Sequence, residues 1–406
     1  MSEPFHCPPL SRYEKEQLIE QAHVACKLTV RNATQFATEH ELDCILHNDK
    51  TDQRATIYKG FDTDDGLPEA GMCAHTRVTA SLEQVADLFY LDNTAKYDAY
   101  SRITGQLVKK KVSLYTLVER HDTLHYIGVE WMVAKTPIGL KDRDFCFIEV
   151  HDEFVFVDRA SQETRRGWVR CLHSIALDCC PPLDKSHAIV RSQFVRSGHV
   201  FMETNRPGVL EYYNLLCGVT RRPGFTPMVA QEFVLRRHVS QILNLDEHFI
   251  TLRLKQLLET PSSSFPARDH AEYCAACYHK FTWLSVKRQC RGCGDVLCTR
   301  CCFKWEVPLT ETVIAMTICR HCAHGDRARP SSLPPSPQSS RFRLDDVHRV
   351  EGHYTSVIVE ELEALPSPLG LHHFTFKGEE DDLALALGAV SPLDAPPELS
   401  MRLVHL

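Results

Sequence analysis

Nine of the 18 cysteines lie between Cys274 and Cys322, and this cluster limits what that part of the chain can fold into. Eight of the nine form four C-x2-C pairs, which begin at Cys274, Cys290, Cys298 and Cys319. Each pair supplies two thiolates and a tetrahedral Zn²⁺ takes four, so the pattern predicts two closed structural zinc sites. A stretch this short buries too little apolar surface to fold unaided, so metal binding would supply its folding energy.

The cluster has nine cysteines, one more than the eight ligands that two zinc sites need. Only Cys301 keeps the two-residue spacing from Cys298, so its neighbour Cys302 is predicted to be a small buried non-ligand. The order of pairing stays open, although the closeness of the second and third pairs in sequence favours an interleaved arrangement over two sequential fingers. Disulfides are the alternative, and they need an oxidising compartment. The predicted zinc ligands are Cys274, Cys277, Cys290, Cys293, Cys298, Cys301, Cys319 and Cys322.

The rest of the composition narrows the class of protein. The amino-terminal residues MSEPFHCPPLSRYEKEQ lack a basic stretch followed by an apolar one, so we expect no secretory signal and a reducing, cytoplasmic location. No run approaches the roughly 18 apolar residues that span a bilayer. The formal net charge of −7 disfavours nucleic acid as a partner of the whole chain. A length of 406 residues leaves room for two or three domains.

Hydrophobic patterning predicts an N-terminal helical segment over 1–55, in which Leu18, Ala22 and Ala25 recur at helical spacing. Residues 56–257 are predicted to form one α+β domain with the order helix, antiparallel strands, helix. A Pro/Ser linker (258–269), the finger (270–325) and a Pro/Ser-rich, acidic tail (326–406) follow. The composition of the tail predicts disorder, because it buries too little apolar surface to offset the entropy of ordering.

Local signals place the elements of the 56–257 domain. Ser81 and Gln84 form a capping box in front of a short helix that buries Val85, Leu88 and Phe89. Arg196, Ser197 and Gly198 are expected to form a hairpin loop between the last two strands. The predicted strands are 124–134, 145–150, 167–175, 188–195 and 199–204.

A second helix closes this domain. It is predicted to begin at Thr226 as N-cap, with Pro227 in the first helical position. Its apolar stripe consists of Met228, Leu235, Val239 and Ile242.

The cysteine spacing, the sequence Cys290-Arg291-Gly292-Cys293-Gly294 and Phe281 before it resemble a FYVE-type zinc finger. The resemblance implies a cross-braced finger with interleaved pairing. Cys274, Cys277, Cys298 and Cys301 would hold one ion, and Cys290, Cys293, Cys319 and Cys322 the other. It also implies two Zn²⁺ as cofactors, and attachment to endosomal or related membranes that bear phosphatidylinositol 3-phosphate.

The lipid-binding motif of that family, R-[RK]-H-H-C-R, is only partly present here. The aligned residues run from Val286 to Arg291, and only Lys287 and Arg291 match in charge. The arginine of the family's R-V-C motif is Thr317, and the family's W-x-x-D element is not recognisable upstream. Lys287, Arg288 and Arg291 still offer three cations for phosphate. Trp283 and Leu284 occupy the loop that inserts into the bilayer in the family, and the alternative is that Trp283 packs on the finger itself.

The helix–strands–helix order and the Asp142-Arg143-Asp144-Phe145 step into a strand resemble a START-type domain. That family wraps a curved antiparallel sheet around its C-terminal helix in a helix-grip fold and encloses one lipid ligand. The candidates for polar side chains that line the ligand site and bind a lipid headgroup are Glu130, Trp131, Arg143, Arg170 and His173. The alternative for each is a position on the protein surface or in a satisfied ion pair.

The adjacent Cys179 and Cys180 precede two prolines and have no histidine or cysteine partner at ligand spacing, so a turn is favoured over a metal or redox site.

Recognisable enzyme motifs are missing from the sequence, including a nucleophile elbow, a phosphate-binding P-loop and a zinc-protease helix. We therefore expect a non-enzymatic, peripheral membrane protein with a lipid ligand in its START-like domain. The alternative is a scaffold whose finger binds a protein partner and whose START-like domain carries no ligand. Flotation with liposomes would separate the two.

Overall fold

The structure is a computed structural model that describes most residues between 5 and 325 and two short segments after them. They include 270–309 and 312–325 of the predicted finger, whereas the helix start predicted at Thr226 and Pro227 and nearly all of the predicted disordered tail lie outside them. The described residues are 5–62, 69–121, 124–136, 141–158, 163–183, 189–218, 228–259, 265, 268–309, 312–325, 357–358 and 375–376.

The chain divides into two compact units. Unit 1 comprises residues 1–47, 54–244 and 354–406, and unit 2 comprises residues 48–53 and 245–353. This division differs from the expected boundaries at residues 55 and 257, because the N-terminal helix packs into unit 1 and a six-residue turn, 48–53, is part of unit 2. Within the described residues, no helix combines the length and the apolar character needed to cross a bilayer.

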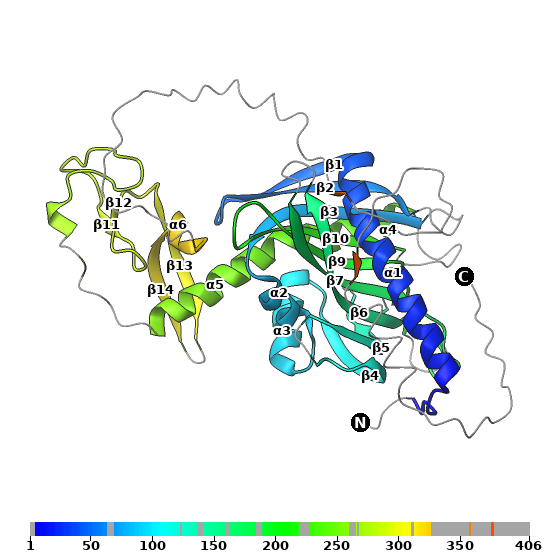
Figure 1. The fold of residues 1–406 in the computed structure, drawn as a ribbon. Helices are drawn as coiled ribbons and strands as arrows, with labels where there is room; N and C mark the ends of the chain where they lie inside the picture. Colours follow the sequence, from blue (N-terminus) through cyan, green and yellow to red (C-terminus); the bar gives the residue numbers. More distant parts are fainter. Residues whose placement is uncertain are drawn as a thin grey trace. The chain divides into compact units, whose positions relative to one another are not determined.

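Unit 1 is built on one large sheet with helices on both faces (Figure 1). The strand order is β1-β2-β3-β10-β9-β7-β6-β5-β4, and the pairs from β2 to β4 are antiparallel. The strands are β1 (Glu41–Asn48), β2 (Gln53–Asp62), β3 (Glu69–Thr79), β4 (Val108–Val118), β5 (Tyr126–Ala134), β6 (Arg143–Asp158), β7 (Thr164–Ser174), β9 (Ser197–Glu203) and β10 (Val209–Cys217). The expected α+β class is confirmed.

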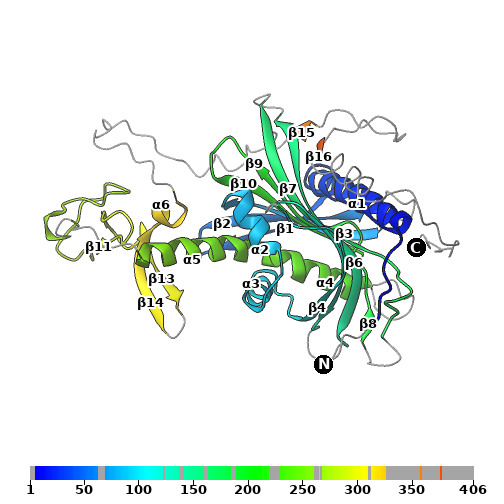
Figure 2. The same ribbon diagram turned by 60° about the horizontal axis from the view of Figure 1, so that its bottom comes forward.

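Helix α1 (Arg12–Glu39) covers one face of this sheet (Figure 2). It begins with a capping box at Ser11, and its buried residues include Leu18, Ala22 and Ala25. These side chains join one apolar core with Val129 and Val169 of the sheet. The expected N-terminal helix is therefore present and belongs to the core. The segment 1–55 was expected to be helical, but the structure is helical there only over Arg12–Glu39, and β1 and the start of β2 occupy its C-terminal part.

The opposite face carries α2 (Leu82–Phe89), α3 (Thr94–Thr104) and α4 (Met228–Val239) (Figure 2). The capping box predicted at Ser81 is confirmed, as is the burial of Val85, Leu88 and Phe89. Leu235 and Val239 of α4 are buried as predicted. The closing helix is interrupted at the 3₁₀ turn Ser240–Leu243 and resumes as α5 (Asn244–Glu259).

The side chain of Asn244 gives a physical reason for this interruption. Its amide donates hydrogen bonds to the carbonyls of Arg102 and Ile103 at 3.2 Å, at the end of α3. Those carbonyls have no partner within their own helix, so the bonds satisfy groups that would otherwise be left open.

One predicted strand and its hairpin are wrong. The run 188–195 contributes only β8 (Val190–Arg191), which pairs in parallel with β6, and Ser197 already belongs to β9. Strand β9 pairs with β7 and β10, so Gly198 does not form a hairpin loop. Its φ is 155°, and a Cβ at this position would lie 1.9 Å from the carbonyl oxygen of Arg170, so no larger residue fits here. The register of a neighbouring strand, rather than a turn, requires this glycine.

Two short segments of the tail region are described, and both pair with the outer part of β6. They are β15 (Val357–Ile358) and β16 (Thr375–Phe376).

Unit 2 contains α5, the 3₁₀ turn Arg268–His270 and two small antiparallel hairpins. The first hairpin pairs β11 (Arg288–Gln289) with β12 (Val296–Leu297), and the second pairs β13 (Cys302–Pro308) with β14 (Val313–Cys319). Helix α6 (Arg320–Ala323) follows. The core of this unit is small and includes many of the cysteines.

Candidate metal centre and buried charge cluster

The two hairpins of unit 2 bring the cysteine pairs together in an interleaved order. Cys274, Cys277, Cys298 and Cys301 form one group, and Cys290, Cys293, Cys319 and Cys322 form the other. Pairing of β11 with β12 places the second and third pairs next to each other, and the β13–β14 hairpin returns the fourth pair to the second. The pairing that the FYVE resemblance implies is confirmed.

The geometry of both groups fits zinc. In each group the sulfur atoms all lie within 4.8 Å of one another. The Sγ atoms of Cys277 and Cys298 are 3.8 Å apart, and those of Cys293 and Cys319 are 3.9 Å apart. A tetrahedron with Zn–S bonds of about 2.3 Å has edges of about 3.8 Å. Two four-thiolate sites, one Zn²⁺ in each, account for these distances.

Backbone N–H groups around the sulfurs favour the thiolate form. The N–H groups of Cys298 and Cys319 donate to the sulfurs of Cys274 and Cys290, each at 3.3 Å. Burial acts to raise the pKa of Cys274, but hydrogen bonds from backbone N–H groups lower it to about 6. Gly294 adopts a φ of 76°, which lets its N–H reach the carbonyl of Cys290 and close the turn of this pair.

Cys302 lies outside both groups, as its spacing predicts. It is 4% exposed, and its thiol donates to the carbonyl of Cys298 at 3.3 Å. It begins β13 and faces the small core of unit 2.

The residues predicted to contact membrane lie in different environments. Trp283 is 92% exposed and Leu284 is 72% exposed, so Trp283 does not pack on the finger. Lys287 donates to the carbonyl of Asp269 at 3.0 Å, and Arg288 is half-buried in β11. The loop therefore presents apolar side chains to solvent next to a strand that carries cations.

Arg291 lines a pocket of about 330 Å³ beside the second cysteine pair. Most of its lining is apolar and comes from α5, Phe265 and β14, and Arg291 is the only charged residue among those that line it in the described chain. Sequence analysis did not identify Leu258 and Phe265, since neither lies in a cysteine motif. The full lining is Leu258, Phe265, Gln289, Cys290, Arg291, Ile314, Ala315, Met316 and Thr317.

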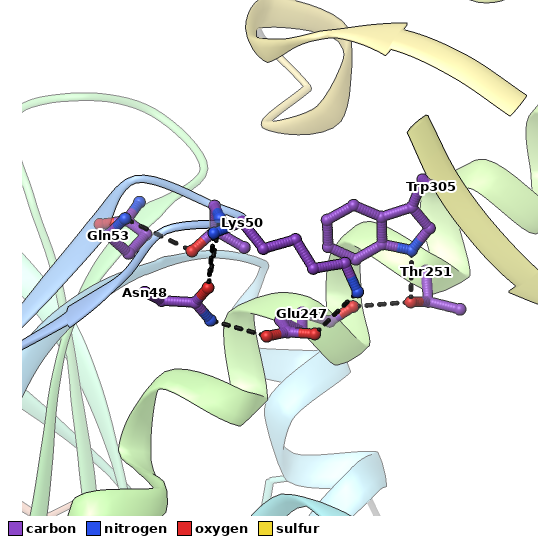
Figure 3. A network of polar contacts seen from close by, with 7 residues as sticks. Asn48, Lys50, Gln53, Glu247, Thr251 and Trp305 are labelled. Atoms are coloured by element: carbon purple, nitrogen blue, oxygen red, sulfur yellow. Dashed lines mark hydrogen bonds and ion pairs between the residues drawn. The ribbon is translucent and has the colours of Figure 1, made fainter. Parts of the chain in front are cut away.

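A polar network inside unit 2 joins the turn 48–53 to α5 and β13 (Figure 3). The ammonium group of Lys50 lies 3.7 Å from the ring centroid of Trp305 and 3.0 Å from the carboxylate of Glu247. Asn48 donates to the same carboxylate at 2.6 Å, and the indole N–H of Trp305 donates to Thr251 at 3.1 Å. The folded finger unit therefore includes residues more than 200 positions earlier in the sequence.

Replacing Trp305 by alanine is expected to destabilise unit 2 by about 3–5 kcal/mol, because the indole is 1% exposed and its removal leaves a cavity. Lys50→Met is the matched milder change and should cost about 0.5–1 kcal/mol, the value of one exposed cation–π contact. Resistance to a zinc chelator, measured as the rate of zinc release, reports both. Equal release rates from Trp305→Ala and the unmodified protein would contradict this assignment.

Unit 1 contains a cluster of buried charges on the sheet face that α2, α3 and α4 cover. Arg170 pairs with Glu149 at 2.6 Å, with both side chains 1% exposed. Lys111 lies 3.1 Å from Glu149 and 3.1 Å from Glu130, and Tyr126 donates to Glu130 at 2.6 Å. Of the polar residues sought in the sequence, Arg170 and Glu130 meet here.

The remaining candidates lie elsewhere. Trp131 faces the α1 side and donates to Asp144 at 3.0 Å. Arg143 and His173 are half-buried, and Nδ1 of His173 accepts a hydrogen bond from the backbone N–H of Arg196 at 3.4 Å.

The pKa shifts in this cluster follow from burial and neighbouring charge. Burial acts to raise the pKa of Glu149, but Arg170 and Lys111 lower it well below its usual range. Burial raises the pKa of Glu130 despite the attraction of Lys111. Burial lowers the pKa of His151 to about 4, so its ring is neutral near pH 7. So many charged side chains are unusual in a protein interior, and they make this face of the sheet polar as well as aromatic.

Comparison with known proteins finds similarities for two parts of the chain. Unit 1 is similar to human StAR-related lipid transfer protein 5, with 10% identity and a TM-score of 0.41 over 58% of this chain and 99% of that one. It is also similar to human STARD10, with 11% identity and a TM-score of 0.35 over 57% of this chain and 84% of that one. Residues 265–326 match the family model of the FYVE zinc finger.

Proposed function

We propose that this protein is a non-enzymatic lipid-binding protein that attaches peripherally to endosomal or related membranes. Unit 1 holds a hydrophobic ligand between its sheet and the helices on the polar face, and the finger attaches the protein to a membrane that bears phosphoinositide. The observation that carries the proposal is the FYVE finger with two apolar side chains, Trp283 and Leu284, exposed at one loop. Tryptophan favours the interface between lipid and water.

The cations beside this loop support phosphate as the membrane group that is recognised. Lys287, Arg288 and Arg291 lie within five residues, and guanidinium groups bind phosphate through paired hydrogen bonds. Arg291 is one of the residues that line the pocket beside β14, so a phosphate group bound there would have this cation as a neighbour.

For unit 1, the START-like architecture and the buried charges support a lipid ligand with a polar headgroup. Arg170, Glu149 and Lys111 supply donors and acceptors that face the helices of the polar side. Mass spectrometry of lipids extracted from purified protein tests this part. Recovery of no lipid in stoichiometric amount, together with no uptake of a fluorescent lipid from vesicles, would contradict it.

A protein-interaction scaffold is the second candidate, and the apolar lining of the finger pocket favours it. Leu258, Phe265, Ile314 and Met316 suit an apolar side chain better than an inositol ring. No nucleic acid is proposed as a partner.

Flotation with phosphatidylcholine vesicles, with and without phosphatidylinositol 3-phosphate, separates the candidates. Trp283→Ala is expected to weaken vesicle binding about 10- to 100-fold, because inserting a large apolar side chain contributes about 1.5–3 kcal/mol. Arg291→Ala should remove the part of binding that depends on the phosphoinositide. Tyr13→Ala is the matched control, since this exposed aromatic residue lies on α1. Absence of vesicle binding under every condition would favour the scaffold.

A further inference from the structure

The adjacent Cys179 and Cys180 lack partners nearby in sequence, but unit 1 supplies one for each from a distant segment. They lie in a turn in which the N–H of Cys180 bonds to the carbonyl of Leu177 at 3.0 Å. The partners are Cys146, which belongs to β6, and Cys7, which belongs to the segment before α1. Cys146 and Cys180 belong to the core on the sheet face that α1 covers, and Cys179 packs against it.

Cys146 and Cys180 are neighbours across the fold, and Cys180 also lies next to a cation. Cys146 lies two residues after Asp144 on the same face of β6, and Arg191 bridges Asp144 to Cys180. The guanidinium of Arg191 is 3.7 Å from the sulfur and 3.2 Å from the carbonyl of Cys180. Arg191 is held in place by Asp144, at 2.9 Å. Cys146 and Cys180 are each 1% exposed, so bulk water does not screen the interaction between the guanidinium and the sulfur.

The neighbours of Cys179 are neutral. The hydroxyl of Tyr115 lies 3.7 Å from its sulfur and donates to the carbonyl of Pro8 at 2.7 Å. Cys7 donates to the carbonyl of Cys179 at 3.9 Å. Both of these cysteines are half-buried. The two halves of the cluster therefore differ in chemistry, and Cys7 and Cys179 form an internal comparison for Cys146 and Cys180.

We propose that Cys146 and Cys180 form a peroxide-sensitive dithiol, in which Cys180 reacts first and Cys146 then closes a disulfide. The thiolate of Cys180 attacks one oxygen of hydrogen peroxide, the O–O bond breaks, and a sulfenic acid and hydroxide form. The sulfur of Cys146 then attacks the sulfenic sulfur and expels its hydroxyl group, which leaves as water with the proton of the Cys146 thiol. Two thiols and one peroxide thus give one disulfide and two waters.

The ionisation of the thiols supports this order of events. The hydrogen bond from Cys146 and the charge of Arg191 lower the pKa of Cys180, whereas the same hydrogen bond raises the pKa of Cys146. Burial raises the pKa of Cys7 to about 12. The thiolate is the reactive form, and the guanidinium of Arg191 lies beside the sulfur of Cys180, so Cys180 rather than Cys146 is the nucleophile of the pair.

The cross-link would tie the segment after β7 to β6. In the reduced protein, Arg191 already holds this segment through the carbonyls of Cys180 and Pro181, at 3.2 Å each. Hydrogen peroxide is small and neutral, so it can reach a buried thiol that larger oxidants cannot.

The test uses the full-length, zinc-loaded protein, treated with hydrogen peroxide, alkylated and mapped by peptide mass spectrometry. We expect a Cys146–Cys180 disulfide that forms about tenfold or more faster than Cys7 and Cys179 lose their thiols, and that a thiol reductant reverses. Because the map resolves each site, oxidation of the eight zinc ligands is read separately. This measurement on the unmodified protein does not depend on whether a variant folds.

Variants then assign the two roles. In Cys146→Ser, the sulfenic acid of Cys180 should persist and be captured by a dimedone-type probe, whereas Cys180→Ser should abolish both labelling and cross-linking at this site. Arg191→Gln should slow the reaction about tenfold, the effect of about one pKa unit on the thiolate fraction. Cys179→Ser is the matched control and should leave the cross-link unchanged. A disulfide between Cys7 and Cys179 in its place, or persistence of alkylatable Cys146 and Cys180 under excess peroxide, would overturn the proposal.

Discussion

Replacement of Cys290 by serine is expected to lower the zinc content of the protein from two ions per chain to at most one. Cys290 is fully buried and accepts backbone N–H bonds from Gly292 and Cys319 at 3.4 and 3.3 Å. A structural zinc site contributes about 10–16 kcal/mol of apparent binding energy. That exceeds the net stability of most domains, about 5–15 kcal/mol, so unit 2 should not fold without it.

Because the ligand pairs of the two sites are interleaved in sequence, loss of zinc from the Cys290 site should also weaken zinc binding at the other site. Cys298 and Cys301 belong to the first group but lie in sequence between two ligand pairs of the second. Metal analysis after dialysis against a weak chelator gives the zinc count, and Cys302→Ser is the matched control because it removes a thiol but no ligand. A Cys290→Ser protein that keeps two zinc ions would refute the eight-ligand assignment.

Replacement of Arg170 by methionine is expected to destabilise unit 1 by about 3–5 kcal/mol, since it leaves Glu149 buried with a weakened set of countercharges. Its guanidinium also lies 5.1 Å from the ring centroid of Tyr100 and 5.8 Å from that of Phe89. These contacts disappear with the charge. The effect should therefore be among the largest of any single substitution in the unit.

The control for this prediction is Arg12→Met, which removes an exposed pair with Glu16 on α1, with side chains 43% and 30% exposed. Pairs of this kind contribute about 0.3–0.5 kcal/mol. Urea denaturation followed by the fluorescence of buried Trp168 reports on the sheet face that contains Arg170. If both variants shifted the midpoint equally, the charges around Glu149 would not be coupled as the distances indicate.

The zinc sites were the most predictable part of this protein. Ligand spacing is local, so four C-x2-C pairs indicate eight ligands without knowledge of the fold, and the non-ligand Cys302 follows from the same spacing. Spacing along the chain did not determine which cysteine pairs share a zinc ion. The pairing came from the family resemblance, and in the structure it results from the registers of two hairpins, such as Cys302 opposite Cys319.

Predictions from hydrophobic periodicity were correct where the element was long and strongly patterned. Strands β5, β6, β7 and β9 and the capping box at Ser81 were found in this way. No strand was identified between 41 and 79, and α3 was missed. The run 188–195 failed because β-branched residues predict extended backbone but not its pairing, and only Val190 and Arg191 meet a neighbouring strand.

By itself, the sequence determined the metal, the number of sites and the α+β class, because each depends on the spacing of residues along the chain. Only the tertiary structure decided which distant groups meet. It placed Arg170 against Glu149, Lys50 over Trp305, and Cys146 beside Cys180. Such contacts depend on strand register and on packing over the whole unit, and a change of register by one residue would turn a strand residue such as Arg170 or Glu149 to the opposite face of its sheet.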